Sequence, residues 1–485
     1  MVYDWQLIGA EWGDEGKGRG VQNIVRNQNI KHVAKYQGGA NSGHTQYIKE
    51  DIKIALHMLP DGVTETGTFN YLTQGVALDL VQTFKEIDEL KGHKISLDGR
   101  LFISHRATVV MAGDVVSDFL SDGNGSTAKG IRYCYGRQSR PRLNIRVEDL
   151  YGKVGNDGKL SEPRISQHLE RFLRTYEGDL AQRLELEIER LKELRSSSDE
   201  KTKIERRLER GIKLREELRS ENEATRLLRQ ADRLLPYVAD TTKMLEDVVN
   251  GDREGILYDG SQAALLDKDS GPGDDLTSSS SSGAALFANL GFSYNNRQMG
   301  RLIRIGVVKH LPTRVGRAGH GFPTRDEKLE TALREKGDER GATTGRPREM
   351  GHPDAVAVAY AVRISGIDGL FYTKADLVDG QGEQKIAIAY KDDDTGVVYP
   401  RMITHREIFD STRLKPIFET HSGWDKLQGA RKEEDTPESF KRFLGRYTDI
   451  ISEKVNRYVP IVAISTSPKS EDFIDLLDRL QLQER

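Results

Sequence analysis

A glycine-rich loop with one lysine, Gly13-Asp-Glu-Gly-Lys-Gly18, lies between a short apolar run and a segment that can start a helix. The apolar run covers residues 6–10, and the helical segment begins near Val21. Backbone N–H groups at a strand-to-helix junction surround phosphate oxygens, glycines permit close approach, and a lysine adds positive charge. The spacing is not that of the standard P-loop, because only two residues separate Gly13 from Gly16. The loop predicts a phosphate site, with a tight structural turn as the alternative.

A second glycine-rich loop, residues 37–45, follows an expected strand over residues 32–36 and holds His44 among small residues. A lone histidine is more often structural, but the small neighbours in this loop would leave the ring accessible. Beside a phosphate loop, an imidazole can act as a general acid or stabilise a developing oxyanion. Asp14 in the first loop can accept a proton or bind Mg²⁺. Strands that alternate with helices and such loops predict an α/β sheet.

Composition limits the class of protein. A chain of 485 residues predicts two to three domains, or one large α/β domain with insertions. The longest apolar runs fall far short of the roughly 18–20 residues of a membrane span, and residues 1–10 lack the pattern of a secretory signal. The single cysteine, Cys134, excludes an internal disulfide and a cysteine-based zinc site, so we expect a cytoplasmic protein. A net charge of -3 argues against a general nucleic-acid-binding role.

Residues 161–253 are rich in Glu, Arg, Lys and Leu. Leucine and isoleucine recur there at helical spacing over residues 184–194 and again over 204–212, with a polar stretch at 196–199 between them. The pattern predicts a charged helical hairpin with a narrow apolar stripe, inserted into the α/β unit. A structural or oligomeric role is favoured, and a nucleic-acid or partner-binding arm is the alternative.

Two later segments place polar groups at expected strand ends. Thr373-Lys-Ala-Asp376 follows a strand over 369–373, where the carboxylate can accept hydrogen bonds from guanine and the lysine stem can cover the base. Ser465 ends another strand, over 461–465, which we expect to be the last strand and to be followed by a C-terminal helix. The serine run at 278–282 is consistent with either a flexible linker or an ordered active-site loop.

A polar loop over residues 341–351 contains Arg346 and Arg348. Two arginines on one loop can form a clamp for a dicarboxylate, because guanidinium and carboxylate groups pair in a bidentate manner. A solvated basic loop is the alternative.

Taken in order, these motifs resemble the adenylosuccinate synthetase family, with the related 2-aminoadenylosuccinate synthetases as nearest relatives. The matching segments are residues 12–18, 37–45, 260–267, 313–316 with 321–324, 341–346, 354–357, 373–376 and 464–466.

The resemblance implies a single catalytic domain over residues 1–485, with a large, mainly parallel central sheet flanked by helices, P-loop-NTPase-like, and a charged helical insertion at 161–253. It implies a homodimeric ligase of purine biosynthesis that uses GTP and Mg²⁺ to join L-aspartate to C6 of IMP through a 6-phosphoryl intermediate. The products are adenylosuccinate, GDP and phosphate.

The resemblance also assigns roles to individual residues. Asp14, His44 and Lys17 would be catalytic, and Asp14 and the Gly43 carbonyl would bind Mg²⁺. Residues assigned to the nucleoside monophosphate are Asn41, Thr127, Gln262, Thr277 and one of Arg140 and Arg142, which would cross the dimer interface. Residues assigned to GTP are Gly13, Glu15, Gly16, Lys17, Gly18, Thr45, Lys374, Asp376 and Ser465. Residues assigned to L-aspartate are Thr343, Arg346 and Arg348.

The sequence departs from the family pattern near the acceptor nucleotide, at residues 126–136 and 272–275. Asp274 or Asp275 could accept a hydrogen bond from the 2-amino group of guanine. A 2-aminoadenylosuccinate synthetase acting on dGMP or GMP is therefore an alternative to an IMP enzyme. A non-catalytic GTP-binding scaffold is a further alternative, although a scaffold does not need Asp14, Lys17 and His44 together.

Overall fold

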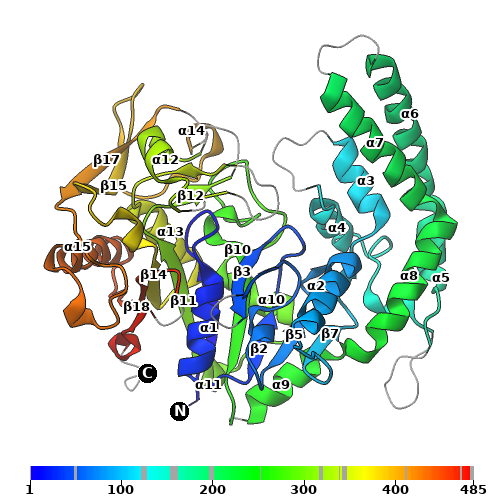
Figure 1. Cartoon of the computed structure of the whole chain (residues 1–485), viewed down its shortest axis with the longest axis horizontal. Coiled ribbons are helices and arrows are strands. Elements are labelled where there is room, and N and C mark those ends of the chain that lie inside the picture. Colours follow the sequence, from blue (N-terminus) through cyan, green and yellow to red (C-terminus); the bar gives the residue numbers. More distant parts are fainter. Residues whose placement is uncertain are drawn as a thin grey trace.

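A ten-stranded sheet forms the centre of the computed structural model, which describes residues 2–48, 52–121, 128–152, 162–195, 201–251, 253–315, 321–337, 339–340, 347–409, 412–469 and 472–480. The strands lie in the order β19-β18-β14-β11-β1-β10-β2-β5-β7-β9 (Figure 1). In chain order they are β1 (Asp4–Gly9), β2 (His32–Lys35), β5 (Phe69–Leu72), β7 (Leu101–Ser104), β9 (Val238–Ala239), β10 (Ile256–Ala263), β11 (Leu302–Lys309), β14 (Gly369–Thr373), β18 (Ile461–Ser465) and β19 (Phe473–Asp475). All neighbours pair in parallel except β18 and β19. The expected large, mainly parallel sheet is confirmed.

β1 lies at the middle of this sheet, between β10 and β11, which come from the second half of the chain. Because β1, β2, β10, β11 and β14 are parallel, their carboxyl ends meet at one edge of the sheet. The first glycine-rich loop leaves β1 at this edge. In open parallel sheets, ligands bind in the crevice outside the carboxyl ends of the strands.

Helices cover both faces of the sheet, because successive side chains of a strand point to opposite faces. α1 (Lys17–Asn27) packs in the cluster that includes Leu7 and Ile305, whereas α13 (Ala355–Ser365) packs in the one that includes Ile8 and Val308. The other helices are α2 (Leu80–Gly92), α3 (Ala112–Leu120), α4 (Ile131–Gln138), α5 (Gln167–Phe172), α6 (Gly178–Arg195), α7 (Lys201–Leu218), α8 (Ser220–Leu234), α9 (Thr241–Gly251), α10 (Leu286–Leu290), α11 (Asn296–Met299), α12 (Glu327–Leu333), α14 (Arg406–Phe409) and α15 (Glu438–Val455).

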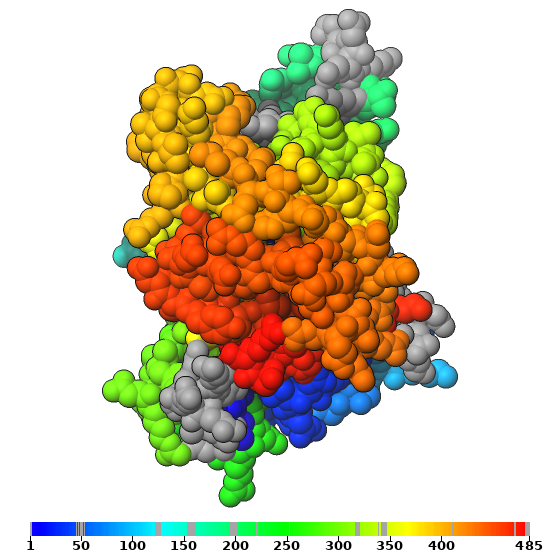
Figure 2. Space-filling view, turned by 90° about the vertical axis from the view of Figure 1, so that its left-hand side faces the viewer, coloured from blue at the N-terminus to red at the C-terminus, as the bar shows by residue number. Residues whose placement is uncertain are grey.

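Smaller sheets accompany the central one. They pair β3 (His44–Ile48) with β4 (Ile52–Leu56), β6 (Ala77–Leu78) with β8 (Thr108–Val109), β12 (Thr313–Arg314) with β13 (Glu349–Met350), and β15 (Gln384–Asp392) with β16 (Val398–Tyr399) and β17 (Leu414–His421). Figure 2 shows the face whose middle is formed by the C-terminal part of the chain, orange to red.

The expected helical segment is present as α6, α7 and α8, which project beside the sheet (Figure 1). Leu184, Ile188 and Leu191 form the buried stripe of α6 and pack in one cluster with Phe119 of α3. The expected turn at 196–199 lies outside the described residues. The last part of the segment belongs to the core, because β9 extends the central sheet and α9 packs beneath it.

The prediction for the C-terminus was wrong. After β18 the chain turns back as the antiparallel strand β19 and then forms a short 3-10 turn over Leu477–Leu480, in place of a helix directly after the last strand. Three residues are too short a run to show strand periodicity in sequence, and pairing with β18 stabilises them. None of the helices in the described part of the chain combines the length and apolar composition needed to cross a bilayer.

Candidate active site

The loop between β1 and α1 turns sharply before the helix begins. Gly13, Asp14 and Gly16 have φ angles of 102°, 62° and 92°, a left-handed conformation that glycine tolerates and that strains an aspartate. Gly16 precedes the first turn of α1, where Lys17 and Gly18 lie. The N–H groups of a first helical turn carry partial positive charge. The loop therefore has the local geometry of an anion-binding turn.

Glu15 holds this loop together from inside. Its carboxylate accepts a hydrogen bond from the Gly13 N–H at 2.7 Å and one from Lys17 Nζ at 2.8 Å. A Cβ on Gly9 would lie 2.5 Å from Glu15 Oε2 and 2.9 Å from the carbonyl oxygen of Gln262. A glycine at position 9 thus lets the buried Glu15 carboxylate approach the end of β10.

Asp14 lies among three cationic side chains from later segments of the chain. Arg348 Nη1 contacts its Oδ2 directly, and Lys309 Nζ and Lys374 Nζ lie 3.5 and 3.8 Å from the same oxygen. Burial alone would raise the pKa of Asp14, but the charges of Lys374, Lys309 and Arg348 outweigh it and hold the pKa well below its usual range. Asp14 is therefore an ionised carboxylate, and its side chain is 34% exposed.

Glu339 is the second carboxylate of this group and has no exposed side-chain surface. It accepts hydrogen bonds from Lys309 Nζ at 2.7 Å, Lys374 Nζ at 2.8 Å and Arg348 Nη1 at 3.0 Å. Burial lowers the pKa of Lys309 to about 8, with repulsion from Lys374 acting in the same direction. We call Asp14, Lys309, Glu339, Arg348 and Lys374 the charged cluster.

His44 is the first residue of β3. Its Nδ1 lies 2.7 Å from Oδ2 of the buried Asp61. β3 packs against the start of α1, and Gln46 Nε2 donates to the Gly18 carbonyl at 3.4 Å. The two glycine-rich loops therefore lie next to each other, as the sequence predicted.

Residues assigned to the monophosphate meet at the end of β10. Gln262 Nε2 donates to Asn41 Oδ1 at 3.3 Å, and Gln262 Oε1 accepts from Ser279 Oγ at 3.1 Å. Ser279 Oγ lies 3.4 Å from Thr277 Oγ1. Ser279 and Ser281 are buried. The serine run is thus an ordered loop beside these residues and not a flexible linker.

Residues assigned to the guanine base lie at the ends of β14 and β18. These two strands are neighbours in the central sheet. Asp376 and Ser465 are both buried, and burial raises the pKa of the Asp376 carboxyl to about 6. Lys374 has a φ of 58°, and its ammonium group points to Glu339 in the charged cluster.

The remaining assigned residues lie outside the groups described above. Arg140 and Arg142 lie exposed after α4, Gly43 directly precedes β3, and Thr45 lies on β3 with its side chain outside the described part. Thr127, Thr343 and Arg346 lie outside the described residues.

Four charged residues near the assigned ones were not found from sequence: Lys309, Glu339, Asp61 and Asp259. Lys309 and Asp259 are charged residues on apolar strands, which was a usable signal. Glu339 and Asp61 lie in polar segments where nothing in the pattern distinguishes them from surface carboxylates.

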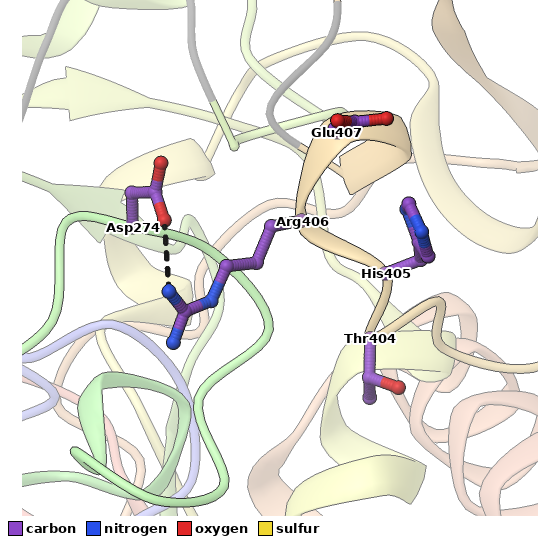
Figure 3. Close-up of a pocket in the computed structure, with 5 residues that line it drawn as sticks. All are labelled: Asp274, Thr404, His405, Arg406 and Glu407. Carbon is purple, nitrogen blue, oxygen red and sulfur yellow. Dashed lines mark ion pairs between the residues drawn. The ribbon is translucent and has the colours of Figure 1, made fainter.

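A cavity of about 540 Å³ lies beside α14, away from the charged cluster, and is lined by Thr404, His405, Arg406, Glu407 and Asp274. Asp274 points toward Arg406, with Oδ1 3.5 Å from Nη1 (Figure 3). Its side chain is 50% exposed. Asp274, one of the two carboxylates considered for a guanine 2-amino group, is therefore paired with Arg406 of α14.

The chain matches known proteins along nearly its whole length. The family model for adenylosuccinate synthetase matches residues 6–474. Adenylosuccinate synthetase from Aquifex aeolicus is 30% identical, and the match covers 98% of this chain and 98% of that protein. The enzyme of the same name from Wolinella succinogenes is 31% identical, over 96% of this chain and 98% of that protein.

Two solved structures are similar to this chain. Fully ligated adenylosuccinate synthetase from Plasmodium falciparum matches with a TM-score of 0.76 and 26% identity, over 98% of this chain and 99% of that one. Succinoaminodeoxyadenylate synthetase of cyanophage S-2L, bound to dGMP and to dATP as an energy donor, matches with a TM-score of 0.55 and 15% identity over the full length of both chains. The second likeness shows the fold alone.

A parallel α/β sheet with an anion-binding turn and buried charges at its carboxyl edge defines a nucleotide-dependent enzyme, and the comparisons make it a ligase rather than a scaffold. The chain belongs to the adenylosuccinate synthetase family. It is a GTP-using ligase that joins L-aspartate to IMP, and the dGMP or GMP alternative is not favoured, because the curated relatives carry the adenylosuccinate synthetase name while the phage enzyme is distant.

Proposed function

We propose that Asp14 is the base and His44 the hydrogen-bond donor of this ligase, and that both act on the 6-oxopurine of IMP. Asp14 accepts the N1 proton while O6 attacks the γ-phosphorus of GTP. The bond from that phosphorus to the β–γ bridging oxygen breaks, and GDP leaves. The amino group of L-aspartate then attacks C6, loses a proton, and displaces phosphate. Holding the reactants in line and neutralising their charge supplies most of the acceleration in phosphoryl transfer.

The observation that carries this proposal is the ionised Asp14 among Lys309, Arg348 and Lys374. Arg348 is the described member of the expected aspartate clamp, and a substrate carboxylate would draw its guanidinium away from Asp14. When one of these cations pairs with a substrate anion, it stabilises the negative charge of Asp14 less. The loss of these contacts makes the carboxylate a stronger base.

Lys17 would hold phosphate groups of GTP with the N–H groups of Gly16 and Gly18, and Gly13, whose N–H donates to Glu15, would shape the turn around them. For this role Lys17 Nζ would share its charge between phosphate and Glu15, its partner at 2.8 Å. Asn41, Gln262 and Thr277 would bind the monophosphate. Gln262 bonds to Asn41 and to Ser279, and the Ser279 hydroxyl lies 3.4 Å from that of Thr277.

Asp14 and the Gly43 carbonyl would hold Mg²⁺. Both offer hard oxygen atoms, Asp14 is ionised and partly exposed, and Mg²⁺ prefers such ligands together with phosphates. When bound, the ion neutralises charge on the transferring phosphoryl group.

We also infer a homodimer that acts in the cytoplasm. Arg140 and Arg142 are exposed in one chain, so either can reach a nucleotide phosphate of a partner subunit. Arg140→Leu and Arg142→Leu, each tested for the KM of IMP, decide between them. Sedimentation should give twice the mass of one chain.

The test of the function measures phosphate release with GTP, Mg²⁺, L-aspartate and IMP, omitting one component at a time. Asp14→Asn and His44→Asn should lower kcat by about 10²-fold or more and keep GTP binding, whereas Asp247→Asn, which changes an exposed carboxylate of α9, should not. Full turnover in both active-site variants would overturn the proposal. Replacing IMP by GMP or dGMP should remove turnover.

A further inference from the structure

A buried carboxylate stands behind His44. Asp61 is fully buried, and its Oδ2 lies 2.7 Å from His44 Nδ1, whereas the imidazole is 11% exposed. Asp61 begins the turn Asp61–Thr64 that follows β4, so it reaches His44 from a different segment than the glycine-rich loops. The contact occupies one ring nitrogen and leaves Nε2 as the nitrogen available to substrate.

Asp259 of β10 lies behind Asp61. Its Oδ2 accepts a hydrogen bond from the Asp61 N–H at 3.2 Å, and ligand atoms of His44, Asp61 and Asp259 all lie within 4.8 Å of one another. Among the described residues, Asp61 Oδ1 and Asp259 Oδ1 have no hydrogen-bond partner, although both are buried. Lys35 of β2 is the nearby cation, and it donates to the His57 carbonyl at 2.6 Å.

Two buried carboxylates this close do not both carry charge at low cost. Burial, and then the charge of Asp61, raises the pKa of Asp259. Burial acts against Asp61 as well, but His44 outweighs it and lowers the pKa of Asp61. Asp61 therefore holds a negative charge more readily than Asp259 does.

We propose that Asp61, supported by Asp259, is a positioning residue that fixes the orientation of His44 for phosphoryl transfer: it accepts a hydrogen bond from Nδ1–H, so that Nε2–H faces the substrate as the donor. A carboxylate that accepts from one ring nitrogen determines which nitrogen faces the substrate, as it does in catalytic triads. The inference rests on the role proposed for His44, and it assigns a residue that the sequence motifs do not contain.

The same three side chains could instead hold a metal ion. A metal on His44 Nδ1 would displace the 2.7 Å contact to Asp61 and would need both carboxylates ionised beside Lys35. The positioning role requires neither change. Whether the protein holds a stoichiometric metal distinguishes the two arrangements.

The experiment compares Asp61→Asn with Asp259→Asn. Glu65→Gln is the control, because it changes a nearby carboxylate that pairs with the exposed side chain of Arg26 and does not contact His44. In Asp61→Asn, kcat should fall by about 10²- to 10⁴-fold, with the KM values for GTP and IMP within about threefold. The ¹⁵N shift of His44 Nδ1 should change, because its charge-assisted hydrogen bond to the carboxylate is lost. Asp259→Asn keeps an acceptor for the Asp61 N–H and leaves the contact of Asp61 with His44 in place, so its loss should be at least tenfold smaller. Glu65→Gln should match the wild type.

An unchanged kcat in a folded Asp61→Asn protein would overturn the inference, as would a loss confined to KM. If Asp61→Asn does not fold, Asp61→Ala and the wild-type ¹⁵N spectrum still decide, because Nδ1 without a proton contradicts the proposal. A stoichiometric metal that survives dialysis against chelator and is lost in both aspartate variants would also overturn it. Full activity of His44→Asn would instead overturn the proposed role of His44 itself.

Discussion

Arg348 Nη1 contacts Asp14 Oδ2 directly, and the same nitrogen donates to Glu339 Oε2 at 3.0 Å. One guanidinium thus joins a residue expected to bind L-aspartate to the residue expected to act as base. The contact links the binding of L-aspartate to the basicity of Asp14, because a substrate carboxylate competes with Asp14 for the guanidinium.

Arg348→Leu should raise the KM for L-aspartate by about 10- to 100-fold, since a charge-assisted hydrogen bond is worth roughly 1.5–3 kcal/mol. The KM for GTP should change little. Steady-state kinetics with L-aspartate as the varied substrate measures this. Arg363→Leu, an exposed arginine of α13, is the matched control and should leave both constants unchanged. A variant with normal affinity for L-aspartate would argue that Arg348 only neutralises Asp14.

Glu339 supplies the negative charge that Lys309, Lys374 and Arg348 share. Glu339→Gln leaves buried cations short of a partner and should lower the free energy of unfolding by about 3–5 kcal/mol. GTP should recover part of this loss, because its phosphates bring negative charge to the same region. The measurement is denaturant unfolding with and without GTP.

The control for that comparison is Glu335→Gln, which changes a carboxylate that is 81% exposed and pairs with Arg340. Its effect should stay within about 0.5 kcal/mol. Equal losses in the two variants would contradict the role of Glu339 as the buried counter-charge of the charged cluster.

Asp354 should make stability fall as pH rises. It caps α13 through the N–H groups of Val356 and Ala357, and burial raises the pKa of its carboxyl from 3.8 to about 6. Between these values the folded chain keeps a proton that the unfolded chain has lost, so the free energy of unfolding falls by about 3 kcal/mol and then levels off.

Asp354→Asn removes this titration and keeps an acceptor for the cap. Relative to wild type, the variant should gain about 3 kcal/mol between pH 4 and pH 7 in urea unfolding. Asp326 caps α12 with a lowered pKa, which hydrogen bonds from Lys328 and His352 cause against the effect of burial. Relative to wild type, Asp326→Asn should therefore lose stability as pH rises toward and through 3.8, below the interval in which Asp354→Asn gains it, and parallel curves for both variants would contradict the assignment.

The strands and both glycine-rich loops could be predicted from the sequence, because apolar runs and glycine spacing are local signals. The charged cluster could not, since Lys309, Glu339 and Arg348 meet only when β11 and the segment after α12 are placed beside the loop of β1. The pairing of His44 with Asp61 depends likewise on how the turn after β4 folds over β3. The local sequence around a carboxylate in a polar segment does not reveal which side chain it will pair with in the folded protein.

The apolar stripe of α6 gives a direct test of what the helical segment contributes. Ile188 is fully buried between α3 and α7, whereas Leu186 on the same helix is 73% exposed. Ile188→Ala should lower the free energy of unfolding by about 2–5 kcal/mol, because it leaves a cavity, and Leu186→Ala should change it by less than about 0.5 kcal/mol. If the segment is structural, kcat per folded molecule stays at the wild-type value in both variants. A lower kcat in folded Ile188→Ala would show that the packing of α6 on α3 affects the active site.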